Sequence, residues 1–127
     1  AELISAKLTM ATGVPAEDAA RAVKQIEKAA QVLGERYTDS EGKSIIRHML
    51  ASVGSQPFQV GFDGVGGAPA GDHLGEVTVE LSAAKLRSIT AVEITAEWRD
   101  LVGGRALTFS HTMTPRHAVD RLWHCAV

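Results

Sequence analysis

The sequence ends in a group of side chains that could bind a metal ion. Imidazole nitrogen and thiolate sulfur are common ligands of zinc. The candidates are His111, His117, His124 and Cys125. On a helix, His117 and His124 would share a face but stand roughly 10 Å apart, which is too far for two ligands of one ion. The sequence therefore predicts neither a metal site nor a cofactor.

Cys125 is the only cysteine of the chain. A nucleophilic thiol needs a base beside it, and the adjacent His124 would point away from it on a helix. We interpret Cys125 and Trp123 as a candidate interface, where large aromatic side chains are favoured. A single cysteine forms no internal disulfide, which is compatible with a reducing compartment and favours a cytoplasmic location.

His111 is the strongest candidate for ligand binding or acid–base chemistry. In an alternating run it shares a side with Leu107 and Phe109, so we expect it to be partly buried. A buried imidazole needs a hydrogen-bond partner and can exchange a proton near neutral pH. The alternative is a histidine whose polar atoms are simply satisfied within the core.

A glycine-rich segment, residues 63–75, is predicted to be a loop because it holds five glycines and one proline in 13 residues. Long loops of this kind often cover a functional site, although a surface loop without a role is the alternative. We expect a pocket beneath it with His111 and Trp98 in its floor and Asp63 and His73 as companions. Alternation does not fix which strands are neighbours or what faces His111, so the sequence predicts no reaction type.

These residues must be positioned by a single α+β domain, residues 1–127. The predicted fold has N-terminal helices packed on one face of a four-stranded, mainly antiparallel sheet, with a C-terminal helix. The helical part is residues 1–54, and the sheet and C-terminal helix are residues 55–127. Helices are expected at 2–11, 16–33 and 44–53, and from Thr114 onward. Strands are expected at 57–62, 76–82, 88–99 and 105–113.

Apolar residues recur three and four positions apart in the helical part, which is typical of helices. The clearest set, in segment 16–33, is Ala19, Val23, Ile26, Ala30 and Leu33. Segments 2–11 and 44–53 hold shorter sets of the same kind. Gly13 and Pro15 favour a helix boundary between the first two segments.

The longest alternating run predicts a β-hairpin made of strands 88–99 and 105–113. One side of its first strand carries Val92, Ile94, Ala96 and Trp98. Such alternation is typical of a strand with one buried face. Gly103 and Gly104 suit the turn, because glycine readily adopts positive φ.

Four short motifs lie near the start of the chain: Ala1-Glu-Leu-Ile4, Thr12-Gly-Val14, Asp18-Ala19 and Ala22-Val23. With them, residues 1–33 resemble the helical hairpin of the HU/IHF nucleoid-associated proteins, over about a quarter of the chain. The resemblance implies dimerisation through the hairpin and DNA binding through basic β-arms. This chain departs from the family in its later strands, which are not basic, so the DNA-contacting positions have no counterparts here.

The charge balance argues against nucleic acid as a partner, because 13 Lys and Arg stand against 15 Asp and Glu, a formal net charge of −2. No apolar run reaches the roughly 18 residues of a membrane span. The lack of catalytic motifs and the edge strands favour a non-enzymatic assembly or interaction subunit that self-associates or binds a partner protein. The alternatives are a small-molecule-binding domain or enzyme with a pocket under the 63–75 loop, and HU-like DNA binding.

Overall fold

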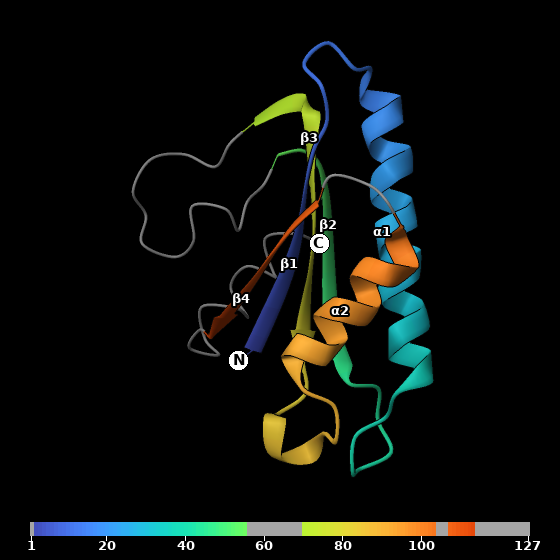
Figure 1. Cartoon of the computed structure of the whole chain (residues 1–127), viewed down its shortest axis with the longest axis vertical. Coiled ribbons are helices and arrows are strands. Elements are labelled where there is room, and N and C mark those ends of the chain that lie inside the picture. Colours follow the sequence, from blue (N-terminus) through green and yellow to red (C-terminus); the bar gives the residue numbers. More distant parts are fainter. Residues whose placement is uncertain (1, 56–69, 104–106, 114–127) are drawn as a thin grey trace.

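The computed structural model of the chain describes residues 2–55, 70–103 and 107–113. Within these residues, four strands form one antiparallel sheet and two helices pack against it (Figure 1). The strands are β1 (Glu2–Thr9), β2 (Ile46–Ser55), β3 (Ala70–Leu81) and β4 (Leu107–Met113). The helices are α1 (Ala16–Arg36) and α2 (Ala91–Val102), and a short 3-10 turn, η1 (Ala84–Leu86), precedes α2. The predicted α+β class with a four-stranded antiparallel sheet is confirmed.

The strands lie in the order β2-β3-β1-β4, and each neighbouring pair is antiparallel. A β-α-β-β-α-β chain with this sheet is the split β-α-β arrangement. The first and last described strands are therefore neighbours, and Ile4 of β1 lies opposite His111 of β4. Residues more than one hundred positions apart in sequence come together at this end of the sheet.

Both helices cover the same face of the sheet (Figure 1). The core joins alternate residues of the central strands to both helices, and it includes Ile4, Ala6, Val77, Val79, Ile26, Leu33, Ile94 and Trp98. The Trp98 indole N–H donates a hydrogen bond of 3.0 Å to the Ile26 carbonyl, so α2 is tied to α1 at the centre of the core.

Three predicted elements match the structure. The helix expected at 16–33 is α1, which continues to Arg36, and the strand expected at 76–82 forms the second half of β3. The strand expected at 105–113 is β4. The strand expected at 57–62 and the helix expected from Thr114 lie outside the described residues.

The helices predicted at 2–11 and 44–53 are wrong, because these segments form β1 and β2, so the N-terminal part is not wholly helical. β1 is a central strand that is buried on both faces, so apolar residues fall on both of its sides and hide the alternation. In β2, a register shift between Ile46 and His48 breaks the alternation and imitates helical spacing.

The strand predicted at 88–99 is also wrong, because residues 91–102 form α2 and the expected hairpin does not exist. Its buried residues Ala91, Ile94 and Trp98 follow helical spacing, whereas Val92 is 79% exposed. The loop predicted at 63–75 is wrong in its second half, because β3 begins at Ala70.

Candidate functional site

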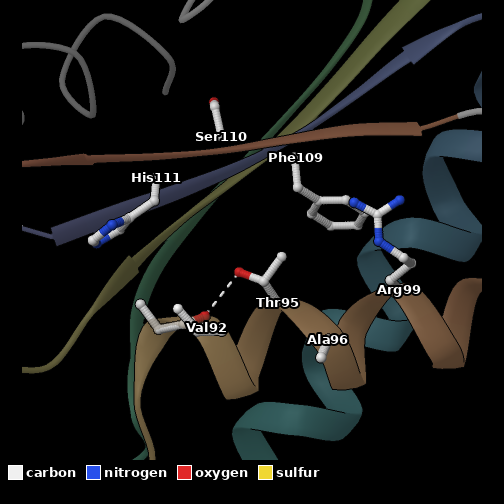
Figure 2. Close-up of a pocket in the computed structure, with 8 residues that line it drawn as sticks. Val92, Thr95, Ala96, Arg99, Phe109, Ser110 and His111 are labelled. Carbon is white, nitrogen blue, oxygen red and sulfur yellow. Dashed lines mark hydrogen bonds between the residues drawn. The ribbon is translucent and has the colours of Figure 1, made fainter.

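A groove of about 340 Å³ runs between α2 and β4 (Figure 2). The helix lines one wall with Val92, Thr95, Ala96 and Arg99, and the strand contributes Phe109 to the floor and His111 to one end. The helical residues lie three and four positions apart and so share one face, and the strand residues are two apart and share one side. The helical repeat of α2 and the two-residue repeat of β4 therefore bring these side chains to the same groove.

The hollow itself exists because α2 presents small side chains there. Ala96 fills little space, and the Thr95 hydroxyl is turned back to donate a hydrogen bond of 2.8 Å to the Ala91 carbonyl (Figure 2). The centre of the helical wall is therefore mostly methyl groups. An apolar side chain of a ligand would be accommodated there without leaving a polar group unpaired.

Phe109 forms the floor of the groove and is supported from behind. Its ring meets Trp98 edge to face, with centroids 5.3 Å apart and an interplanar angle of 69°. Trp98 is fully buried and is fixed by its hydrogen bond to the Ile26 carbonyl. The floor is therefore held by the core and not by a loop.

Arg99 lies at the Phe109 end of the groove, with its guanidinium carbon 4.7 Å from the ring centroid (Figure 2). This is a cation–π contact. The Arg99 side chain makes no salt bridge and no hydrogen bond with any residue in the described ranges. Its positive charge is therefore not balanced by a carboxylate of the described chain.

His111 lies at the opposite end, and its charge environment differs. Its Nε2 atom is 2.6 Å from a carboxylate oxygen of Glu2, and the second oxygen of Glu2 is paired with Arg87. Arg87 also donates hydrogen bonds to the carbonyls of Ser82 and Ile89. A carboxylate is thus already built into this end of the groove.

The predicted pocket residues do not all meet. His111 lines the groove but is exposed, so the expectation that it is partly buried is wrong. Trp98 lies behind Phe109 in the core, on a helix where a strand was expected. The His73 carbonyl accepts a hydrogen bond from the N–H of Met10, which directly follows β1, whereas His111 lies opposite Ile4. Met10 and Ile4 are six residues apart in an extended chain, so about 20 Å separates the two histidines.

The other predicted site residues, Asp63, Trp123 and Cys125, lie outside the described ranges. Sequence reasoning missed Arg99 and Glu2. Arg99 could have been found from the helix signal at Thr90 and Glu93, whose side chains form a reciprocal capping box at the start of α2. No local signal pairs Glu2 with residues more than eighty positions away.

A second group of polar side chains lies on the sheet face that is turned away from both helices. The Ser5 and Thr78 hydroxyls are 2.8 Å apart across β1 and β3, and His48 Nδ1 is 2.5 Å from the buried Glu80 carboxylate. These contacts pair the polar atoms with one another, as buried polar groups require. We interpret this group as structural.

The chain matches no protein-family model, no curated protein and no solved structure. Neither helix of the described residues is long and apolar enough to cross a membrane. The groove combines an apolar hollow, an aromatic floor and a cation at one end.

Proposed function

We propose that this domain is a non-enzymatic interaction module of a larger assembly, and that it binds an extended segment of a partner protein along β4. The observation that carries the proposal is the position of the groove beside an edge strand. Within the described residues, β4 pairs only with β1. The outer N–H and C=O groups of such a strand are a template for a further strand.

Strand addition would use both parts of the site. Hydrogen bonds to the β4 backbone would supply affinity, and side chains on the helix-facing side of the added strand would enter the groove. Every second side chain of an extended segment would point toward α2. Specificity would therefore come from the α2 residues that line the groove.

The dimensions of the groove support an extended ligand. Val92 and Arg99 are seven residues apart on α2, which corresponds to about 10 Å along the helix axis. Side chains on one side of an extended chain are about 6.6 Å apart. The groove therefore has room for two successive helix-facing side chains.

A small-molecule ligand is the second candidate, and the volume of about 340 Å³ favours it, because ligand sites begin at about 300 Å³. The two candidates differ in what they do to β4. A bound strand protects backbone amides along β4 from hydrogen exchange, whereas a small molecule contacts side chains and protects few of them.

The test is a display selection with random peptides that match the seven residues of β4 in length. Ala96→Trp fills the groove from an exposed helical position, so it should lower the affinity of the selected peptides about tenfold or more. Ala16→Trp is the matched control, because Ala16 is also exposed on a helix but lies outside the groove.

Support requires selected peptides that lose affinity in Ala96→Trp, keep it in Ala16→Trp, and slow amide exchange in Leu107–Met113. A selection that yields no such peptides contradicts strand addition. Binding that is equal in both Trp variants contradicts it as well, because the ligand then lies elsewhere.

A further inference from the structure

We infer that the segment bound along β4 carries a carboxylate that pairs with Arg99, and an apolar side chain next to it on the same side that fills the hollow at Ala96. This inference rests on the proposed strand addition and specifies its ligand. The motivating observation is the unequal charge at the two ends of the groove.

The charge distribution orients the ligand. At the His111 end, Glu2 already accepts from Arg87 and contacts His111, so these groups are not left without a carboxylate partner. At the Arg99 end, no carboxylate of the described residues competes for the guanidinium. Complementary charge fixes the register of a bound segment more than it adds to affinity. A ligand carboxylate is therefore favoured at Arg99 over His111.

Arg99 is held in place for this contact. The Phe109 ring positions the guanidinium, and Phe109 is itself positioned by the buried Trp98. A guanidinium presents its N–H donors as a planar fork that matches both oxygens of a carboxylate. Because the side chain is already ordered by the ring, less conformational entropy is lost when the carboxylate binds.

The spacing on α2 matches the spacing of an extended segment. Ala96 and Arg99 are three residues apart, which is about 4.5 Å along the helix axis. The long arginine side chain extends its reach beyond that distance. Helix-facing side chains of a strand lie about 6.6 Å apart, so an apolar residue at Ala96 places the next such residue near the guanidinium.

The carboxylate could come from an Asp or Glu side chain within the segment or from the free carboxyl end of a chain. Synthetic peptides separate the two sources. The parent peptide alternates Thr and Val, has the length of β4, and is acetylated and amidated at its ends. In the series, the first or the last Val is replaced by Glu, Gln or Lys, which covers both strand directions. One further Gln peptide has a free carboxyl end.

Each peptide is titrated by fluorescence anisotropy into the wild-type chain, Arg99→Gln and Ala96→Trp. We expect one Glu peptide, or the peptide with the free carboxyl end, to bind about fivefold more tightly than its amidated Gln counterpart, and the Lys peptide more weakly. The ratio of the two affinities, carboxylate peptide to Gln peptide, should fall to about one in Arg99→Gln. It should also shrink as salt is raised, because the pair is exposed.

The outcomes separate the two proposals. If no peptide binds in a way that Ala96→Trp weakens, strand addition is wrong and this inference fails with it. If peptides bind and Ala96→Trp weakens them, but Glu, Gln and Lys peptides bind equally, this inference alone is overturned. A carboxylate preference that survives in Arg99→Gln also overturns it, because another cation is then responsible.

Discussion

Tyr37 stands at the junction where the end of α1 meets α2. A hydrogen bond to Glu97 is the largest cause that raises the pKa of the Tyr37 phenol above its ordinary value of 10.0, and burial and the negative charge of Glu97 act in the same direction. Arg36 opposes them and also forms a 3.2 Å salt bridge with Glu97. Glu97 thus pairs with Arg36 and disfavours the charged form of Tyr37.

We expect the ultraviolet titration of the phenol to show a pKa above 10.0 in the folded protein. The signal is unambiguous because Tyr37 is the only tyrosine. Glu97→Gln should lower this pKa, since it removes the negative charge that disfavours the phenolate. Glu17→Gln, at the far end of α1, is the control and should leave the titration curve in place.

The sign of the pH dependence follows from the direction of the shift. A phenol whose pKa is higher in the folded state than in the unfolded state contributes stability that is complete below the unfolded value, near 10. That contribution is lost as the pH rises through the folded pKa. The free energy of unfolding, measured with urea across this alkaline range, should fall as the contribution is lost. A titration midpoint that Glu97→Gln does not move would show that Glu97 is not the cause.

At the scale of elements, the sequence predicted those in which the apolar residues follow one clear period, such as α1 and the second half of β3. The α1 residues Ala19, Val23 and Ile26 keep helical spacing because the opposite side of α1 faces solvent. The sequence of β4 alternates as well, which placed His111 on the groove side, although in the structure only Leu107, Phe109 and Ser110 of this strand are partly buried. The correct part of the candidate site follows from this simple pattern.

The helix α2 was missed because two burial patterns overlap. Ile94 and Trp98 are four residues apart, so they share a side in a strand and a face in a helix. The exposure of Val92 separates the two possibilities only in the structure. Since Arg99 belongs to this helix, the wrong assignment of α2 also concealed the positive end of the groove.

Gly75 sets how closely α1 approaches the sheet. A Cβ atom at this position would lie 2.5 Å from a Val23 methyl group and 3.3 Å from the Ser52 carbonyl oxygen. We expect Gly75→Ala to lower the free energy of unfolding by about 1–3 kcal/mol, because α1 or Val23 must shift. Chemical denaturation with urea measures the change.

The matched control shortens the opposing side chain. Val23→Ala alone should destabilise the protein through a cavity, but Gly75→Ala in that background should cost roughly 1 kcal/mol less than in the wild type. Simple additivity of the two changes would show that the clash with Val23 does not determine the packing distance.

At the scale of the whole molecule, the site depends on sheet order, which no local pattern specifies. The pairing of β1 with β4 brings Glu2 to His111 and so balances one end of the groove. Alternation predicts which side of a strand is buried but not which strand lies beside it. For this reason, the charge asymmetry of the groove could only be recognised in the folded chain.

The final prediction concerns backbone protection across the sheet in the chain without ligand. β1 has a strand on each side, so all its N–H groups can be hydrogen-bonded and should exchange slowly from Leu3 to Leu8. β4 has β1 on one side within the described residues, so every second N–H of Leu107–Met113 points away from the sheet. Hydrogen exchange followed by NMR should therefore show continuous protection along β1 and alternating protection along β4. Continuous slow exchange along β4 in the unbound chain would mean that its outer edge is already paired, and strand addition of a partner segment would then have no place to occur.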